Sequence, residues 1–235
     1  MKILVIIPAY NEEKNIINVV NKIEELDIDV DYLVINDCST DGTLDVLRNN
    51  RMHYLSLPVN LGIGGGVQTG YRYAVEHDYD IAIQHDGDGQ HDPKYFNDVI
   101  EPILSGEADI VIGSRFIEKQ GFQSSALRRF GINFLSKLIQ RVCGVKIKDV
   151  TSGYRAVNKK YISFYAKDYP SDYPEPEAIV SASLRGAKIK EVPVIMNERQ
   201  NGVSSINYSK SIYYMIKVSI SIIICRLSYR RKARV

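Results

Sequence analysis

The chain has 235 residues, 45% of them hydrophobic, and a formal net charge of +2 at pH 7, which is an ordinary globular composition. A chain of this size buries one substantial core, so we expect one domain with at most an appendage. The three cysteines lie far apart and form no CxxC pair, which argues against a disulfide framework or a zinc cluster and favours a reducing cytoplasm.

Positive charge is concentrated towards the C-terminus. No Asp or Glu follows Glu198, whereas eight Lys and Arg residues do, so the body of the chain is acidic and the tail is basic. The acidic body argues against nucleic-acid binding. The apolar run at 3–8 ends within the length of one strand and has no charged segment before it, so we expect no signal peptide.

Short β-rich runs alternate with helix-like segments from the N-terminus onward. Strands are predicted at 2–8, 31–37, 53–58, 79–86 and 108–115, and helices at 11–26, 39–50, 64–77 and 93–106. The second of these helices is expected to be capped by Ser39, Thr40 or Asp41. Strands separated by helices imply βαβ units, hence an α/β fold with a Rossmann-like, mostly parallel sheet flanked by helices. Ligands bind such sheets beyond the carboxyl ends of the strands.

Three aspartates crowd the end of one predicted strand, in the stretch IAIQHDGDGQHDP. Asp86, Asp88 and Asp92 repel one another unless a cation or a cationic ligand lies between them. An EF-hand loop is excluded because His91 and Asn97 occupy the positions of its glycine and its bidentate glutamate. What remains is an Asp-x-Asp pair, which can hold Mg²⁺ or Mn²⁺ and leave coordination positions open for phosphate oxygens. A solvated acidic turn is the alternative.

The glycine pattern does not fit a nicotinamide-dependent enzyme. The first strand-to-helix turn, PAYNEE, has no glycine. The later cluster of Gly62, Gly64, Gly65 and Gly66 does not form GxGxxG, because Val67 takes the last position. This cluster predicts either a tight turn leading into a closely packed helix or a direct phosphate contact.

Six motifs follow one another in the order found in a known family: PAYNEE at 8–13, NDCSTDGT at 36–43, NLGIGGGVQTG at 60–70, DGDGQHDP at 86–93, GSRF at 113–116 and DVTSGYRA at 149–156. Together they resemble the family 2 glycosyltransferases of the GT-A fold, in the branch of the dolichyl-phosphate mannosyltransferases and bacterial polyprenyl-phosphate glycosyltransferases. The resemblance extends through EVPV at 191–194 and the ERQNGVSSI that follows. It implies a GT-A catalytic domain at 1–205 and a basic, apolar tail at 206–235.

The resemblance also implies a role for each matched position at the donor site. The nucleotide of a nucleotide-sugar is expected to bind Pro8, Tyr10, Glu12, Asp37 and Asp86. The cofactor, Mg²⁺ or Mn²⁺, is expected to bind Asp86, Asp88 and Gln90 and to bridge the donor's pyrophosphate. A loop over the donor's phosphates is expected at Arg199 and Ser204, although the lysine that several relatives carry near this point is missing.

On the acceptor side, the resemblance implies that a phosphate is held by Arg115, Arg129 and Asn133. Arginine suits this task because its guanidinium binds phosphate through paired hydrogen bonds. Whether Arg128 or Arg129 faces the site stays open, and a solvated helix face is the alternative for both. Catalysis is expected to rest on Asp86, Asp88 and Arg115.

The activity implied is an inverting, metal-dependent transfer of a sugar from a nucleotide-sugar, preferably a UDP-sugar, to polyprenyl (undecaprenyl) phosphate for cell-surface glycan synthesis. A lipid phosphate is already ionised and needs no general base. A sugar hydroxyl as acceptor would need one, and the candidates are Asp149, Glu175 and Glu177. The alternatives from other classes are a nucleotidyltransferase and a non-catalytic nucleotide-sugar-binding subunit.

The tail is largely apolar from Ile212 to Cys225 and basic after it. The apolar run is shorter than the roughly 20 residues of a membrane-spanning helix and contains Lys217. As an amphipathic helix it fits a segment lying on anionic lipid, which predicts a peripheral protein on the cytoplasmic, inner face of the cell membrane. The alternatives are packing against the catalytic domain, a homo-oligomer or a separate membrane-protein partner, and VSISI also alternates like a strand.

Overall fold

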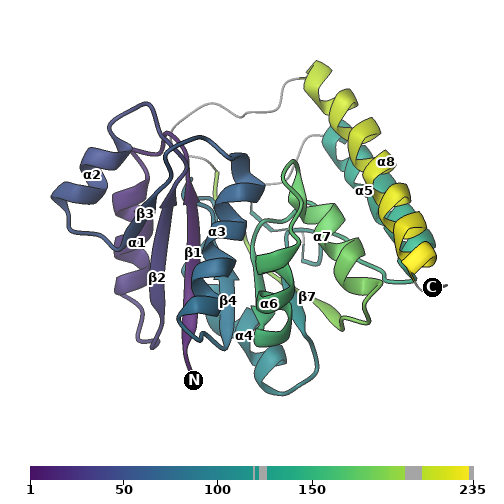
Figure 1. Cartoon of the computed structure of the whole chain (residues 1–235), viewed down its shortest axis with the longest axis horizontal. Helices are drawn as coiled ribbons and strands as arrows, with labels where there is room; N and C mark the ends of the chain where they lie inside the picture. The colour runs from purple at the N-terminus through teal and green to yellow at the C-terminus, as the bar shows by residue number, and fades with distance from the viewer. Residues whose placement is uncertain (119, 122–125, 199–207, 233–235) are drawn as a thin grey trace.

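The computed structural model describes residues 1–118, 120–121, 126–198 and 208–232. Within these residues a seven-stranded sheet carries helices on both faces (Figure 1). The strands are β1 (Ile3–Ala9), β2 (Asp31–Asn36), β3 (Tyr54–Ser56), β4 (Ile81–Gln84), β5 (Ile110–Ser114), β6 (Arg155–Asn158) and β7 (Ile189–Pro193). The helices are α1 (Ile16–Glu24), α2 (Thr43–Asn49), α3 (Gly62–Glu76), α4 (Phe96–Leu104), α5 (Ala126–Cys143), α6 (Lys159–Lys167), α7 (Pro174–Ser183) and α8 (Tyr208–Lys232), with a 3₁₀ turn at Pro93–Tyr95.

The strand order is β3-β2-β1-β4-β6-β5-β7. Strands β1 to β4 pair in parallel, and so do β5 and β7, whereas β6 runs antiparallel to both β4 and β5. The predicted mostly parallel α/β sheet is confirmed, although α1 begins at Ile16 and α2 at Thr43, later than predicted. Because β6 is reversed, its first residue, Arg155, pairs with Gln84 at the carboxyl end of β4.

The sheet separates two hydrophobic cores. On β1, Leu4 and Ile6 point into one core and Val5 and Ile7 into the other, as expected for a strand that is buried on both faces. This is why the strand is apolar at every position and shows no alternation of apolar and polar residues. The larger core lies under α3, α5, α6, α7 and α8, and the smaller one lies under α1, α2 and α4.

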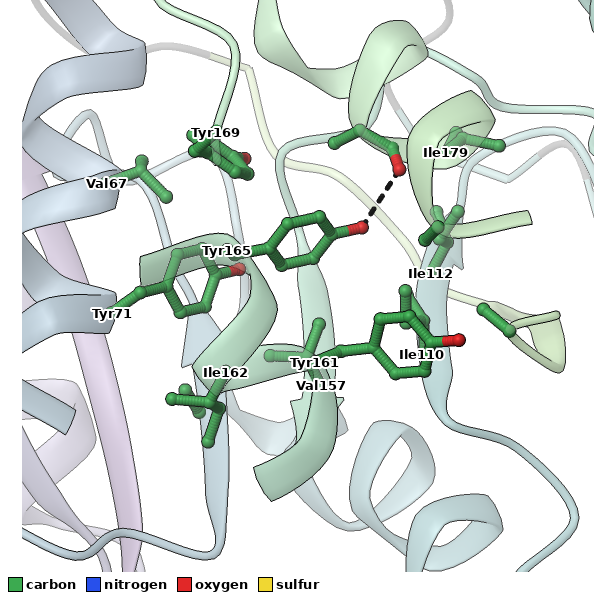
Figure 2. Close-up of a cluster of buried hydrophobic side chains, with 14 of the residues drawn as sticks. Val67, Tyr71, Ile110, Ile112, Val157, Tyr161, Ile162, Tyr165, Tyr169 and Ile179 are labelled. Atoms are coloured by element: carbon green, nitrogen blue, oxygen red, sulfur yellow. Dashed lines mark hydrogen bonds between the residues drawn. The ribbon is translucent and has the colours of Figure 1, made fainter. Parts of the chain in front are cut away.

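Tyrosines from α3, α6 and the segment after α6 meet in the larger core (Figure 2). The ring of Tyr71 lies 5.4 Å, centroid to centroid, from the rings of both Tyr165 and Tyr169. Tyr165 satisfies its buried hydroxyl by donating to the Ala178 carbonyl of α7, 3.0 Å away. The hydroxyl of Tyr169 donates to Oε1 of Gln84 at 3.4 Å. These contacts fix α6 and α7 relative to the carboxyl end of β4.

The glycine-rich segment packs closely against its surroundings. A Cβ at Gly70 of α3 would lie 2.3 Å from Cγ2 of Ile6 on β1, and a Cβ at Gly64 would lie 2.0 Å from the carbonyl oxygen of Pro170. Both distances are far below van der Waals contact, so a side chain at Gly70 would displace the buried Ile6 side chain and one at Gly64 would displace the backbone. The packing interpretation is confirmed at these two positions, while a phosphate contact by the cluster stays a prediction.

The tail forms α8, which lies against α5 and α7 on the side of the molecule away from β3 (Figure 1). Val218 and Ile222 are buried in the larger core. The outer face exposes large apolar side chains, which are Tyr213, Ile216, Ile220, Ile223, Ile224 and Leu227. Among the described residues, no helix combines the length and the apolarity needed to cross a membrane. The tail is therefore helical as predicted, and it is buried along one face and exposed along the other.

Candidate active site

The predicted site residues gather where the parallel strands end. Pro8 is buried near the end of β1, and Ala9, the last residue of β1, pairs with Asn36 at the end of β2. The loops that follow β1, β2 and β4 thus start at one edge of the sheet, which is where α/β sheets bind ligands. Two predicted residues of the donor-phosphate loop, Arg199 and Ser204, lie outside the described residues.

The loops after β1 and β2 present one exposed ring and two buried carboxylates. Tyr10 is 48% exposed, so its ring can stack on a base. Glu12 is buried, and its Oε2 accepts from Nδ2 of Asn15 at 2.6 Å. Asp37 is also buried, and its Oδ1 accepts from the backbone N–H of Leu61 at 2.7 Å. Both carboxylates are therefore fixed in place before any ligand binds.

The turn after β2 is held by an aspartate that lies before the helix. No side chain caps α2, so the predicted cap by Ser39, Thr40 or Asp41 is wrong. Asp41 instead accepts from the backbone N–H of Thr43 at 3.0 Å, as in an Asx turn. Desolvation acts to raise the pKa of Asp41, but the hydrogen bonds from Thr43 outweigh it and lower the pKa. Within the same turn, Cys38 adopts the left-handed region with a φ of 56°.

The Asp-x-Asp pair follows β4 directly, and both carboxylates are partly exposed. Oδ1 of Asp86 accepts from Nε2 of Gln84 at 3.4 Å. A Cβ at Gly153 would lie 2.7 Å from Oδ2 of Asp86, so a side chain at this position of the loop before β6 would displace the carboxylate. Asp88 accepts from the backbone N–H of Gln90 at 3.0 Å. The two carboxylates are thus held by hydrogen bonds at the sheet edge and remain partly exposed to solvent.

This donor set fits Mg²⁺ or Mn²⁺ that shares its coordination with a phosphate. Carboxylate and amide oxygens are the ligands such ions prefer. No group of three His, Cys, Asp or Glu side chains arranged to hold a metal exists in the part of the chain that the structure describes. Asp86 and Asp88 would therefore supply only part of the coordination shell. The side-chain nitrogen of Gln90 donates to the carbonyl of Asn197 at 3.4 Å, which leaves its amide oxygen as the candidate ligand.

Two buried histidines lie behind the Asp-x-Asp loop and were not assigned a role from the sequence. His85 and His91 are 1% and 2% exposed. Burial lowers the pKa of His91 to about 4, and it also lowers the pKa of His85 well below its usual value. Both rings are therefore neutral at pH 7. His91 accepts a hydrogen bond on Nδ1 from the backbone N–H of Asp86, whereas both ring nitrogens of His85 have no hydrogen-bond partner among the described residues.

Arg115, expected to hold an acceptor phosphate, forms a buried ion pair with Asp149. Its Nε and Nη2 donate to the two carboxylate oxygens at 2.6 Å each, and Nη2 also donates to Oγ1 of Thr151 at 3.0 Å. Burial acts to lower the pKa of Arg115, but Asp149 outweighs it and raises the pKa. Both oxygens of Asp149 are engaged, which leaves this carboxylate poorly placed to take a proton from a substrate. The ion pair was not predicted from the sequence.

Helix α5 carries the other residues expected at the acceptor. The guanidinium carbon of Arg129 lies 5.8 Å from the ring centroid of Phe116, and Asn133 is exposed. Arg128 is exposed as well, yet desolvation by the surrounding protein and the charge of Arg115 lower the pKa of its guanidinium. Arg128 is thus an arginine of α5 within electrostatic reach of Arg115, and the sequence had left open whether Arg128 or Arg129 faces the site.

The two glutamates of α7 considered as bases differ in their electrostatic surroundings. Burial raises the pKa of Glu175, opposed by Arg155, and the charge of Asp86 raises it further. Burial also raises the pKa of Glu177, but this carboxylate is hydrogen-bonded to Ser221 of α8. Glu175 thus interacts electrostatically with Asp86 and Arg115, whereas Glu177 interacts with the tail.

Comparison with known proteins places this geometry in a family. A model of Glycosyl transferase family 2 matches residues 4–165. The chain is a family 2 glycosyltransferase. This family 2 glycosyltransferase is 29% identical over 226 residues to the polyprenol monophosphomannose synthase of Mycolicibacterium smegmatis, covering 92% of this chain and 85% of the relative. It is also 31% identical to the UDP-N-acetylglucosamine–dolichyl-phosphate N-acetylglucosaminyltransferase of Methanococcus voltae, covering 82% and 84%.

Solved structures confirm the fold of this glycosyltransferase. Glucosyl-3-phosphoglycerate synthase from Mycobacterium tuberculosis in complex with UDP superposes with a TM-score of 0.73 at 19% identity, covering 96% of this chain and 80% of that one. A second structure of that synthase contains Mn²⁺, UDP and glucosyl-3-phosphoglycerate, and superposes with a TM-score of 0.69 at 20% identity, covering 97% and 79%. The enzyme thus has the GT-A fold expected from its motifs.

Proposed function

We propose that this glycosyltransferase moves a sugar, with inversion, from a nucleotide-sugar to a polyprenyl phosphate at a membrane surface. The observation that carries the proposal is a juxtaposition of charge and apolar surface. Helix α5 bears Arg128, which interacts electrostatically with Arg115 and Asp149, and packs against α8, whose outer face exposes six large apolar side chains. A lipid phosphate needs a cationic site and an apolar surface together. Relatives named for polyprenyl- and dolichyl-phosphate acceptors support the same acceptor class.

On the donor side, Tyr10 stacks on the base, while Glu12 and Asp37 accept hydrogen bonds from the nucleoside. Asp86 and Asp88, with Gln90, would hold Mg²⁺ or Mn²⁺, which neutralises charge on the departing nucleoside diphosphate. We favour UDP as the nucleotide, and two of the structures similar in fold contain UDP. The names of the relatives include both mannosyl and N-acetylglucosaminyl transfer, so they do not indicate one sugar.

On the acceptor side, the phosphate is already ionised and attacks without a general base. Arg115 and Arg129, with Asn133, are the residues expected to hold it, and Arg128 joins them on the basis of its position. Their task is to place one phosphate oxygen in line with the anomeric carbon, since positioning supplies much of the rate when no proton transfer is needed. Asp149 keeps the guanidinium of Arg115 fixed for this contact through its two 2.6 Å hydrogen bonds.

A sugar hydroxyl is the second candidate acceptor, and Glu175 is the observation that favours it. This carboxyl interacts electrostatically with Asp86 and Arg115, and burial raises its pKa, as expected for a general base tuned towards neutral pH. Transfer to a hydroxyl would require Glu175 to take the proton as the new glycosidic bond forms. Asp149 and Glu177 are less suited, because their carboxylates are engaged by Arg115 and Ser221.

The exposed face of α8 is proposed to lie on anionic lipid at the cytoplasmic surface of the membrane. A strip of apolar side chains flanked by basic residues fits the interface of an anionic bilayer. Sedimentation with vesicles of phosphatidylglycerol and phosphatidylcholine, against phosphatidylcholine alone, tests this assignment. We expect binding to the anionic vesicles that is lost in Ile220→Ser/Ile223→Ser. A wild-type dimer that dissociates in this variant, without vesicle binding, would indicate a second copy as the partner.

The experiment that tests the activity is transfer of radiolabel from UDP-glucose, UDP-N-acetylglucosamine or GDP-mannose to undecaprenyl phosphate with Mn²⁺ or Mg²⁺, measured in the organic phase. We expect labelled lipid from one donor, no product after EDTA treatment, and none from Asp88→Ala. Asp98→Ala, which removes an exposed carboxylate of α4, is the matched control. Donor hydrolysis without lipid product from all three donors would contradict the proposed acceptor and favour a hydroxyl acceptor with Glu175 as base.

A further inference from the structure

A buried cluster of rings lies directly behind the Asp-x-Asp loop, and no step of the proposed reaction uses it. It consists of His85, His91, Phe96 and Tyr154. His91 stacks on Tyr154 at a centroid distance of 5.0 Å and an interplanar angle of 21°. The hydroxyl of Tyr154 donates to the carbonyl of Asp92 at 3.3 Å. The stacking and this hydrogen bond fix the plane of the His91 imidazole relative to the loop that carries Asp86.

The contacts of His91 determine which nitrogen carries its proton. Nδ1 accepts from the backbone N–H of Asp86 at 3.3 Å, so the proton of the neutral ring is on Nε2. This buried Nε2 has no hydrogen-bond partner among the residues that the structure describes. It lies 3.9 Å from Oδ2 of Asp86. Buried donors in native proteins are nearly always paired, so an unpaired one this close to a carboxylate requires an explanation.

We propose that His91 is a positioning residue that holds Asp86 through both its backbone N–H and its carboxylate. The proposal rests on the proposed function only in that Asp86 serves the donor site. When nucleotide and metal bind, the Asp86 carboxylate turns so that Oδ2 accepts from Nε2–H of His91. Because this acceptor is charged, the bond is stronger than one between neutral groups. Gly153 permits the arrangement, since a Cβ there would lie 2.7 Å from the same oxygen.

The hydrogen bond from Nε2–H of His91 would orient the carboxylate of Asp86. Asp86 accepts from Gln84 on Oδ1, so a second bond from His91 to Oδ2 would fix the rotation of the carboxylate. A carboxylate fixed on its buried side presents its remaining lone pairs towards the nucleotide and the metal. Groups that orient a metal-binding carboxylate typically contribute 10–100-fold in metal affinity or activity.

The test measures nucleotide binding, which needs no acceptor. UDP, and GDP in parallel, are titrated with Mn²⁺ into wild type and into His91→Phe, His91→Asn and His91→Gln, with urea unfolding of each. His91→Phe keeps a ring on Tyr154 but loses both nitrogens, and we expect affinity for the nucleotide that the wild type binds to fall about 10–100-fold. His91→Gln restores a donor near Nε2, whereas His91→Asn restores only an acceptor near Nδ1. We therefore expect His91→Gln to bind more tightly than His91→Asn.

Phe96→Leu is the matched control, because Phe96 is buried in the same cluster but contacts His85 at 5.6 Å. We expect this variant to lose stability while keeping its nucleotide affinity within about 3-fold, which is below 1 kcal/mol. Wild-type affinity in His91→Phe would overturn the proposal, and so would equal affinities of the Gln and Asn variants. If His91→Phe does not fold, the comparison of Gln with Asn decides. Nucleotide binding without lipid product would refute the proposed acceptor alone, whereas a wild type that binds neither nucleotide would refute both.

Discussion

Removing the carboxylate of Asp149 tests how the ion pair with Arg115 contributes to the enzyme. Asp149 is fully buried and Arg115 is 5% exposed, so Asp149→Leu leaves a guanidinium buried without its partner. Breaking a buried ion pair from one side costs about 3–5 kcal/mol of the free energy of unfolding. That is a large share of the roughly 5–15 kcal/mol by which domains are stable. We therefore expect Asp149→Leu to be severely destabilised.

The assay is urea unfolding followed by far-UV circular dichroism. Wild type is compared with Asp149→Leu, Arg115→Met and the double variant. The double variant removes both charges together, and we expect it to be more stable than Asp149→Leu alone. An Asp149→Leu variant within about 1 kcal/mol of the wild type would refute the reasoning, since ordinary substitutions cost that much. Lost transfer activity at unchanged stability would indicate that Asp149 acts in the reaction, either by positioning Arg115 or as the general base.

Three further predictions concern packing, backbone strain and charge. Gly70→Ala should lose about 1–3 kcal/mol in thermal unfolding, because its Cβ would lie 2.3 Å from a β1 side chain, and an unchanged midpoint would contradict the packing argument. Cys38→Gly relieves a φ of 56° and should gain up to about 1 kcal/mol, so a lower midpoint would count against strain there. Burial raises the pKa of Glu175, so wild-type stability should fall as pH rises through that pKa, and Glu175→Gln should gain relative to wild type over the same range. If the difference in stability between Glu175→Gln and wild type does not vary with pH, the pKa of Glu175 is not raised in the folded state.

Hydrophobic pattern predicted the first half of the fold because each element there carries its own local signal. The run at 3–9 is apolar throughout, as a strand covered on both faces must be, and α1 repeats its buried residues at helical spacing. β6 is different. It has four residues, and its direction is set by the long connection through α5 that reaches it, which no local pattern records. The starts of α1 and α2 were predicted too early, because side-chain contacts between the loops before them determine where these helices begin.

The sequence located the site but not its pairings. It placed Asp86 and Asp88 at the end of a strand, where the structure has them. The ion pair between Arg115 and Asp149 could not be predicted, because the two residues are 34 positions apart and each was equally consistent with binding a ligand. His91 was considered only as a mismatch to an EF-hand loop. The ring of His91 stacks on Tyr154, which lies just before β6. That contact depends on β6 pairing antiparallel to β4, and no local pattern around His91 indicates this pairing.

Because Arg115 is paired with Asp149, other cationic residues must neutralise the charge of an acceptor phosphate. Arg115 and Asp149 together carry no net charge, so the pair can orient a phosphate by hydrogen bonding but does little to neutralise it. Positive charge has to come from elsewhere, and Arg128 on α5 already interacts electrostatically with Arg115. Because α5 packs against α8, phosphate recognition and the exposed apolar face belong to one pair of helices. An acceptor with a charged head and a long apolar chain would use both features, whereas a free sugar would leave the apolar face without a function.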